Sequence, residues 1–436
     1  MVPQKNKIVC IEDDSSGVLK KLDGIDFPEG WQPRQLGSFC ELRNEQVRPS
    51  DSRDLPYIGL EHIDSGEHVI RRHGSPLEVR STKNSFKAGD ILYGKLRPYL
   101  DKAAIVDFDG ICSTDILVVR TDEGEAEPEF VVSGLHTRSF LKYAVSTTTG
   151  VNHPRTSWNA LKKYWLHIPP LPEQQAIASI LRTVQQAKEA CERVVAATRQ
   201  LEQSLLQYLF TYGPVPFDQA DKVPLKETAS GLIPERWNSV SLGDVLRLVY
   251  RYPSYYNISY VDDGVPEIRG ELLKSNGRIE TDRRMFRFIS PETSGRFPRT
   301  QLEEGDIVMS VRGTMGKIGL VPQRLAGANM TANLLRLSPD RTRVLPEYLR
   351  IVLLSPRFLR RLNELSPQTT IKTIQAPVLK SIKIILPSMP EQCEIANHLL
   401  AVETKLAAEE ARRDSLANLF QSLLHHLMTG KVRVTG

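Results

Sequence analysis

Several short stretches of the sequence contain residue types that could perform catalysis. RGTMGKIG, from Arg312, has glycine and lysine as in a phosphate-binding loop, but Val311 and Ile318 stand where that motif needs glycine and a hydroxyl residue. IPPLP, from Ile168, shares two prolines with an adenine-methylating motif, but it lacks the amide before them and the aromatic residue after them. No pairing of a nucleophile with a base is convincing, so we expect a non-catalytic protein.

No stretch predicts a bound metal or cofactor in this chain. The acidic run EDD at Glu12 lies in a polar leader, and no GxGxxG follows a predicted strand. His425 and His426 fall near the end of a long predicted helix, where we expect partly exposed positions. The cysteines lack CxxC spacing, and we expect reduced, buried thiols at Cys10, Cys40, Cys112, Cys191 and Cys393.

Side chains that could recognise a polyanion gather in two sets of loops. Arginine can bind guanine through two hydrogen bonds, asparagine can bind adenine, and lysine contacts phosphates. The first set of candidate DNA-binding residues is Arg71, Arg72, Lys95, Arg97, Tyr99, Lys102, Thr149, Asn152 and Arg155. The second set is Arg269, Arg283, Arg312, Lys317, Asn329, Thr331, Asn333 and Lys372. A solvated loop charge is the alternative for any single member, so the prediction concerns the loops as groups.

The two sets occupy corresponding parts of an internal repeat. FPEGWQPRQLGSF, from Phe27, returns as IPERWNSVSLGDV at an offset of 206. AGDILYGKLRPYL, from Ala88, returns as EGDIVMSVRGTMG at an offset of 216, and PLPEQ, ending at Gln174, returns as SMPEQ at an offset of 218. Offsets that grow by small steps are expected when two copies of one module differ by loop insertions. The sequence therefore predicts a tandem duplication.

Each copy has the pattern of an α+β domain. Short runs rich in β-branched residues predict strands, namely ILYGK, AAIVDF and DILVVR in the first copy and DIVMSV, KIGLV and NLLRL in the second. EPEFVVSGLHTRSFLKYAV and LPEYLRIVLLSPRFLRRL predict helical segments. We expect two domains of similar fold, each with a curled, mostly antiparallel sheet.

A long helix with a heptad pattern follows each copy. The seam predicted for the first helix is Ile177, Ile180, Val184, Ala187, Cys191, Val194, Thr198, Leu201, Leu205 and Tyr208. The seam predicted for the second is Ile395, Leu399, Val402, Leu406, Glu409, Arg413, Leu416, Phe420, Leu423 and Leu427. Steps of three and four residues favour an antiparallel coiled coil of the two helices, a rod of roughly 55 Å. The alternative is that each helix packs on its own domain.

These features divide the chain into seven segments. They are a leader over 1–26, a first domain over 27–168, a first long helix over 169–212, a linker over 213–232, a second domain over 233–386, a second long helix over 387–430 and a tail over 431–436. The leader resembles the linker DKVPLKETASGLIPERW, which suggests two matching docking straps. The two domains have diverged in their loops and would be held by a rod. They could therefore recognise two different short base sequences, here called words, on one duplex.

The overall composition is compatible with a protein that binds a polyanion such as DNA. The chain has 436 residues, a formal net charge of +5 and 40% hydrophobic residues, which is typical of a globular protein with more than one domain. No apolar run approaches the ~20 residues of a membrane helix, and the amino terminus lacks the apolar region of a signal peptide. We expect a cytoplasmic protein without a membrane partner.

From about Phe27 to Val434 the chain resembles the specificity (S) subunit of Type I restriction–modification systems. The resemblance rests on the duplicated PEGW and PERW segments, the GDI strands, and the PPLPEQ and PSMPEQ openings of the long helices. It implies two target-recognition domains, each reading one half of a bipartite, asymmetric site on double-stranded DNA. It also implies two methyltransferase (M) subunits that carry S-adenosylmethionine for adenine N6 methylation, and two restriction (R) subunits that use ATP and Mg.

Two other functions remain open. A duplicated scaffold that binds proteins would show little dependence of its affinity on salt, whereas phosphate contacts give a steep dependence. A DNA-modifying enzyme in its own right would bind S-adenosylmethionine without partner subunits.

Overall fold

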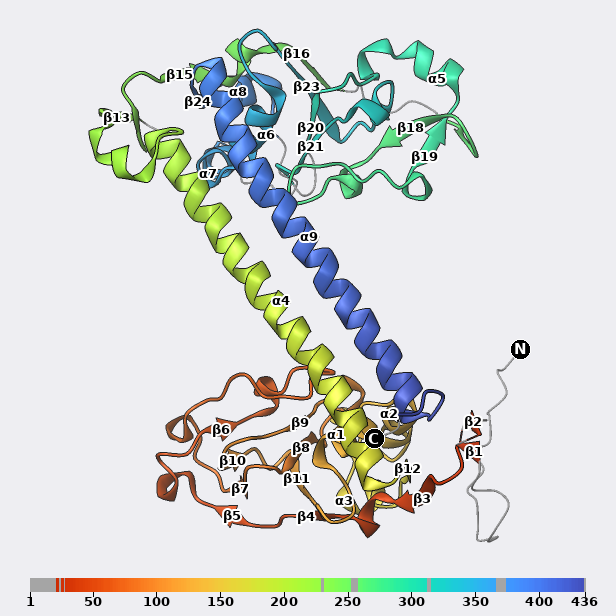
Figure 1. Cartoon of the computed structure of the whole chain (residues 1–436). Coiled ribbons are helices and arrows are strands. Elements are labelled where there is room, and N and C mark those ends of the chain that lie inside the picture. Colours follow the sequence, from red (N-terminus) through yellow and green to blue (C-terminus); the bar gives the residue numbers. More distant parts are fainter. Residues whose placement is uncertain are drawn as a thin grey trace. The chain divides into compact units, whose positions relative to one another are not determined.

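The computed structural model describes residues 21–22, 25–26, 28–228, 231–251, 258–311, 315–365 and 374–434. The chain divides into two compact units, each of which takes part of both long helices (Figure 1). Unit 1 comprises Met1–Arg193 and Glu410–Gly436, and unit 2 comprises Val194–Glu409. The predicted long helices are therefore components of the two units.

Unit 1 contains two four-stranded sheets and a two-stranded ribbon. The ribbon pairs β3 (Gln32–Gln35) with β12 (Trp165–Ile168). The first sheet is antiparallel, in the order β4 (Cys40–Leu42), β11 (Ile116–Thr121), β8 (Ile91–Gly94) and β9 (Ala103–Ile105). The second runs in the order β5 (Gln46–Val47), β7 (Lys83–Phe86), β10 (Gly110–Cys112) and β6 (Tyr57–Ile58), and its β10–β6 pair is parallel. The predicted, mostly antiparallel pairing is confirmed, but the strands form two sheets where one curled sheet was expected.

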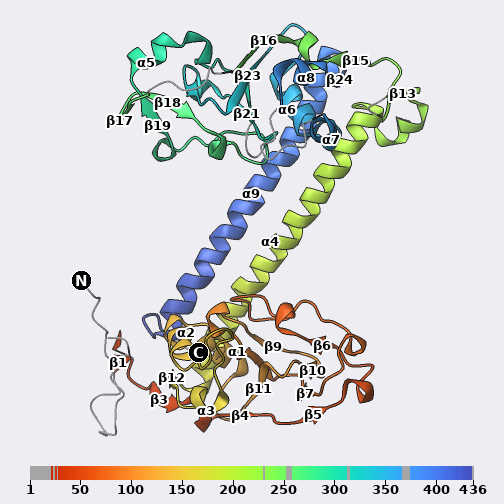
Figure 2. The same cartoon turned by 180° about the vertical axis from the view of Figure 1, so that it is seen from behind.

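Unit 2 repeats this plan with one change of pairing. Its ribbon pairs β15 (Asn238–Ser241) with β24 (Lys383–Leu386). The antiparallel sheet runs in the order β16 (Leu246–Arg251), β23 (Leu334–Pro339), β20 (Ile307–Ser310) and β21 (Ile318–Leu320). The other sheet, visible from behind in Figure 2, runs β17 (Tyr260–Val261), β19 (Arg287–Ile289), β18 (Val265–Ile268) and β22 (Asn329–Met330). Both units keep one parallel pair, β6–β10 and β18–β22, but the third strand joins opposite members of that pair.

Each predicted helical segment forms two short helices. In unit 1 they are α1 (Pro128–Leu135) and α2 (Arg138–Ser146), and in unit 2 they are α6 (Pro346–Leu354) and α7 (Pro356–Glu364). Thr137 and Ser355 cap the second helix of each pair, because each side chain accepts a backbone N–H. Shorter helices complete the units, namely α3 (Trp158–Leu161), α5 (Pro291–Arg296) and α8 (Ala376–Ser381).

The long helices are α4 (Leu171–Tyr212) and α9 (Met389–Met428). The glutamine of each Pro-Glu-Gln motif ties the helix start to its own domain. The Gln174 amide donates to the carbonyl oxygens of Glu125 and Pro169 and accepts from the Glu127 N–H. Gln392 makes the same three contacts with Arg343, Pro387 and Leu345. The repeated motif is therefore explained as a joint between domain and helix.

The glutamate of the same motif is bound differently in the two units. In unit 2, Glu391 accepts hydrogen bonds from Arg236 and Trp237 of the PERW segment. In unit 1 the arginine of that segment is replaced by Gly30, and Arg433 near the carboxyl end forks onto Glu173 at 2.7 and 2.8 Å. The carboxyl end of the chain thus completes the first domain's joint.

The core of each unit includes residues of both long helices. In unit 1, Ile177 and Leu181 of α4 pack in one cluster with Phe420 and Leu424 of α9. In unit 2, Leu209 and Phe210 of α4 share a cluster with Ile395 and Leu399 of α9. All ten predicted seam positions of α9 are buried or half-buried.

The predicted seam of α4 was wrong at two positions. Val194 and Leu201 are 41% and 54% exposed, whereas Val195 is 5% exposed. The cysteine prediction also failed in part, since Cys393 is exposed while Cys40, Cys112 and Cys191 are buried thiols. Cys10 lies outside the described residues.

The leader and the linker both contain a short antiparallel hairpin. In the leader it pairs β1 (Lys21–Leu22) with β2 (Ile25–Asp26), and in the linker it pairs β13 (Leu225–Thr228) with β14 (Gly231–Pro234). No helix in the described part of the chain is long and apolar enough to span a membrane. Over the same residues, no group of three or more His, Cys, Asp or Glu side chains could hold a metal ion.

Candidate nucleic-acid interface

In unit 1 the structure brings two of the predicted loops together. Strand β8 is buried along its whole length, and the loop of residues 95–102 leaves its end. The Lys95 N–H donates to the Asp115 carbonyl oxygen at 3.0 Å, and the Arg97 N–H donates to the Pro154 carbonyl oxygen at 2.8 Å. Thr149 and Arg155 exchange both backbone hydrogen bonds. Residues 95–102 and 147–156 therefore form one surface, which we call the first reading loop pair.

Arg155 fixes this loop pair through a carboxylate. Its Nε and Nη2 donate to the two oxygens of Asp115 at 2.9 and 3.2 Å. The hydrogen bond from Arg155 and its charge hold the pKa of Asp115 below its usual range. A contact between Arg155 and DNA stays a prediction, and the bond to Asp115 gives Arg155 a positioning role as well.

The exposed members of the first reading loop pair have mixed chemistry. Arg97, Thr149 and Asn152 are exposed, and Tyr99 is 52% exposed at the tip of residues 95–102. Such a surface offers a guanidinium, hydroxyl and amide groups, and an aromatic face. Lys95 is half-buried beside them.

Three other predicted residues of unit 1 are held by protein groups. Lys102 donates its Nζ to the Leu60 carbonyl oxygen at 2.6 Å. Arg72 pairs with Asp64 at 2.6 Å, and both side chains are exposed. Arg71 contacts Glu67 at 2.9 Å and Glu189 of α4 at 3.2 Å. Arg71 thus ties the domain to the first long helix.

In unit 2 the structure describes only part of the corresponding loops. Lys317 and Asn333 are exposed there. The Val311 N–H donates to the Asn333 carbonyl oxygen at 3.1 Å, so the two segments adjoin. Thr331 is half-buried, and its N–H bonds to the Ile268 carbonyl oxygen. The predicted residues Arg312 and Lys372, with most of the SPQTTIKTIQ loop, lie outside the described residues.

Asn329 requires a correction, because its side chain lies inside the domain. It is 1% exposed, its amide oxygen accepts from Ser294 at 2.7 Å, and its amide nitrogen donates to Thr300 at 2.9 Å. A buried amide needs such partners, and both ends are used internally. The structure therefore gives Asn329 a structural role in place of the predicted contact with a base.

Two further predicted arginines of unit 2 are Arg269 and Arg283, and the sequence analysis missed the cation–π contacts near them. Arg269 is half-buried and bonds to Glu271 and to the Met285 carbonyl oxygen. Arg283 is exposed, pairs with Asp263, and lies over the Phe288 ring at 4.7 Å. Tyr260 is 49% exposed and has the Arg287 guanidinium over its ring at 5.4 Å. The spacing of Tyr260 and Arg287 in the sequence gave no signal, because β17 and β19 pair only in the fold.

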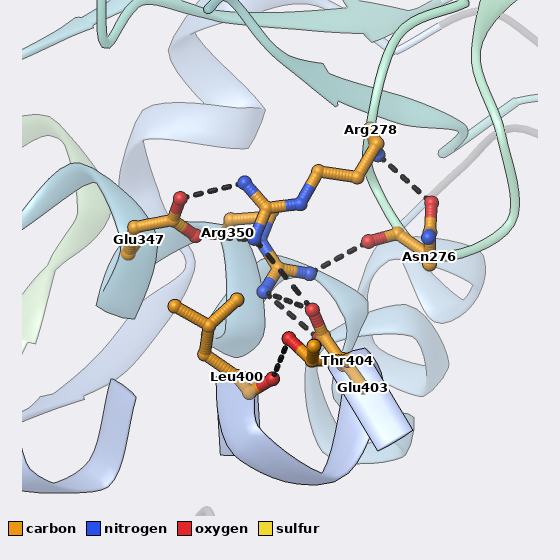
Figure 3. Close-up of polar contacts among 7 residues, drawn as sticks. All are labelled: Asn276, Arg278, Glu347, Arg350, Leu400, Glu403 and Thr404. Atoms are coloured by element: carbon orange, nitrogen blue, oxygen red, sulfur yellow. Dashed lines mark hydrogen bonds and ion pairs between the residues drawn. The ribbon is translucent and has the colours of Figure 1, made fainter. Parts of the chain in front are cut away.

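A buried arginine attaches domain 2 to its long helix (Figure 3). Arg350 of α6 is fully buried and donates two hydrogen bonds to Glu403 of α9, at 2.8 and 2.9 Å. It also donates to Glu347 at 3.0 Å and to the Asn276 carbonyl oxygen at 2.6 Å, and Arg278 donates to the other oxygen of Glu347. Each of the three guanidinium nitrogens donates to at least one acceptor, as a buried charge requires.

The corresponding attachment in unit 1 has the opposite polarity. Glu403 matches Gln185 at the helix offset of 218, and Gln185 donates to Glu67 of domain 1 at 2.6 Å. Lys188 of α4 donates to the other oxygen of Glu67 at 2.5 Å. Domain 1 thus contributes a carboxylate to this attachment, whereas domain 2 contributes a guanidinium. Both attachments hold the loop-bearing domain against a long helix.

Comparison with known proteins gives matches over nearly the whole chain. The family model described as the Type I restriction modification DNA specificity domain matches residues 28–195 and again residues 234–418. The MjaVIII specificity subunit of a Type I restriction enzyme from Methanocaldococcus jannaschii is 23% identical over 437 residues, covering 95% of this chain and 96% of that protein.

Two solved structures have a similar fold. One is the S subunit of a Type I restriction–modification system from M. genitalium, with a TM-score of 0.60, 14% identity, and coverage of 93% of this chain and 97% of that one. The other comes from a study of complex assembly in the type I R-M system, with a TM-score of 0.53, 22% identity, and coverage of 93% and 100%. The chain therefore belongs to the family of Type I restriction–modification DNA specificity proteins, and its two repeats are two copies of the specificity domain.

Proposed function

We propose that this protein recognises a bipartite, asymmetric site on double-stranded DNA and reads one word with each specificity domain. The observation that carries the proposal is a common frame with divergent loops. Each loop follows an equivalent strand, β8 in unit 1 and β20 in unit 2, and ends at an equivalent lysine, Lys102 or Lys317. Between these points LYGKLRPYLDK stands against VMSVRGTMGK. Similar frames with different loops suit two domains that recognise different base sequences.

The long helices act in this proposal as an antiparallel spacer. In unit 1 the first part of α4 shares a core with the last part of α9, and in unit 2 the last part of α4 shares a core with the first part of α9. An antiparallel pair would give this arrangement. A helix of 40 residues, the length of α9, spans about 60 Å, which is long enough to set a gap between two words.

The chemistry belongs to partner subunits in this proposal. Two methyltransferase subunits would bring S-adenosylmethionine and methylate an adenine in each word at N6. Two restriction subunits would bring ATP and Mg. The chain itself would act without catalysis, in the cytoplasm, as the subunit that selects DNA. Membership of the specificity family supports this division of labour.

The dependence of binding on salt tests the proposal against a protein-binding scaffold. We expect the affinity of the full-length chain, assembled with its methyltransferase subunits, for duplex DNA to fall steeply with salt. A protein that neutralises about six phosphates gives a slope of log K against log salt near about −5. Fluorescence anisotropy of a labelled duplex between low and moderate salt measures this slope. A flat dependence would favour the scaffold.

A further inference from the structure

We propose that Asp101 and His136 form a positioning pair that sets the conformation of residues 95–102 and thereby determines how sharply domain 1 reads its word. The inference rests on the proposed function and deepens it. Neither residue was among the predicted DNA-binding residues; His136 is buried and Asp101 is half-buried. Their role would be exerted through the loop that they hold.

The loop contains a strained backbone at two points. Among the residues that the structure describes, Arg97 and Asp101 are the non-glycine residues with a positive φ, at 53° and 51°. They bracket a single 3-10 turn over Pro98–Leu100, which presents Tyr99 and Leu100 outward. Left-handed backbone is unfavourable for a bulky residue such as arginine, and it persists where surrounding contacts impose it. Strain of this kind is common at functional sites, and here it lies in a candidate reading loop.

His136 supplies the contact that imposes this conformation. Its Nδ1 lies 2.8 Å from Oδ1 of Asp101, and its Nε2 lies 2.9 Å from the Ala103 carbonyl oxygen. The Ala103 carbonyl oxygen can only accept, so Nε2 donates to it, and Nδ1 faces the Asp101 carboxylate. The His136 side chain is 2% exposed. Separating the two groups would leave a buried polar ring without a partner, so the contact holds Asp101 in place.

The elements around the pair make it rigid. The Gly66 N–H donates to the Asp101 carbonyl oxygen at 2.8 Å, and α2 packs against the turn. His68 stacks on His136 with ring centroids 4.5 Å apart and meets Phe420 of α9 edge to face. Burial lowers the pKa of His68 well below its usual value, and the charge on His136 adds to this, so His68 is a neutral ring in the stack. The contacts run from α9 through two histidines to the loop.

Unit 2 has a left-handed backbone at the corresponding position without such a pair. Gly316 occupies the position of Asp101, since both precede the matching lysines Lys317 and Lys102. Its φ is 84°, a conformation that glycine adopts without strain. Leu354, at the end of α6, occupies the position of His136. An aspartate in place of glycine is unfavourable for the backbone alone, so its side chain must contribute something that glycine does not.

The test replaces the pair and measures each word separately. Full-length protein assembled with its methyltransferase subunits selects duplexes from a random-sequence pool, and sequencing gives the base preference at every position of both words. We compare wild type with Asp101→Asn, Asp101→Gly, His136→Leu and the double variant Asp101→Gly/His136→Leu, which installs the arrangement of unit 2. We expect each variant to lose about tenfold of the preference for the first word. The second word should remain as sharp as in wild type, and it serves as the internal control.

The double variant separates positioning from stability. Glycine accepts the left-handed backbone, and leucine fills the histidine site without leaving a buried polar ring unpaired, so thermal stability should exceed that of His136→Leu and Asp101→Gly. The base preference at the positions of the first word should nevertheless stay weaker than in wild type. If the double variant, or the near-isosteric Asp101→Asn, reads the first word as sharply as wild type, the pair is only structural and the inference is wrong. If wild type itself selects no words, the proposed function fails and the inference fails with it.

Discussion

Arg350 illustrates how one buried residue can decide where a domain is attached. The guanidinium is fully buried, and its acceptors are carboxylates on α6 and α9 and a backbone carbonyl oxygen. At the matching place in unit 1 the acid is Glu67 and the donors come from α4. Each domain therefore carries the charge that suits its own helix. A domain moved onto the other helix would meet a group of the wrong sign.

Replacing Arg350 should weaken this attachment. Arg350→Met keeps the volume but leaves Glu403 and Glu347 with only the half-buried Arg278 as a partner. Removing one side of a buried pair costs about 3 kcal/mol. Arg361→Met, which breaks an exposed pair with Glu364 on α7, should cost less than about 1 kcal/mol. Hydrogen exchange of the α6 amides under native conditions measures both losses. Equal effects of the two variants would contradict the tether.

At the residue scale the sequence predicted the hydrogen-bonding chemistry of the candidate side chains better than it predicted which of them are exposed. Arg97, Asn152 and Asn333 are exposed in loops, as a reading role requires. Asn329 has the same chemistry but lies inside the domain, because β22 pairs with β18 and turns its side chain toward Ser294 and Thr300. Residue type sets which hydrogen bonds are possible, whereas burial depends on contacts between distant segments.

Helices were predictable at the element scale because their pattern is local. The heptad steps gave α9 and most of α4, and the proline and glycine boundaries agree with the helix ends to within about two residues. Val194 and Leu201 were misassigned, since a strict heptad continued where the buried face passes to Val195. The parallel pairs β6–β10 and β18–β22 join segments more than 50 residues apart, and no local period encodes them.

A change in helix length tests the spacer at this scale. We expect four residues inserted after Ala197, about one helical turn, to lengthen the gap between the two words while leaving both words unchanged. The physical reason is that the insertion lies in the long helix, away from both sets of loops. Methylome sequencing of cells that carry the variant gives the gap directly. Altered words with an unchanged gap would contradict the spacer role.

At the scale of the whole molecule, the chain is one domain design used twice with different details. The joints at Gln174 and Gln392 are the same, while the attachments at Glu67 and Arg350, and the turns at Asp101 and Gly316, differ. The glutamine joints anchor each domain to its long helix, whereas the differing turns at Asp101 and Gly316 lie in the candidate DNA-binding loops. This division is what two independent reading heads on one frame would need.

The most direct measurement exchanges one head. Residues 31–165 are replaced by the matching residues of a relative with a different target, chosen to keep a glutamate at the position of Glu67, and N6-methyladenine is mapped across the host genome. The account predicts that one half of the methylated site changes to the relative's word, while the other half and the gap stay as they were. A site in which both halves change, or neither does, would contradict one word per domain.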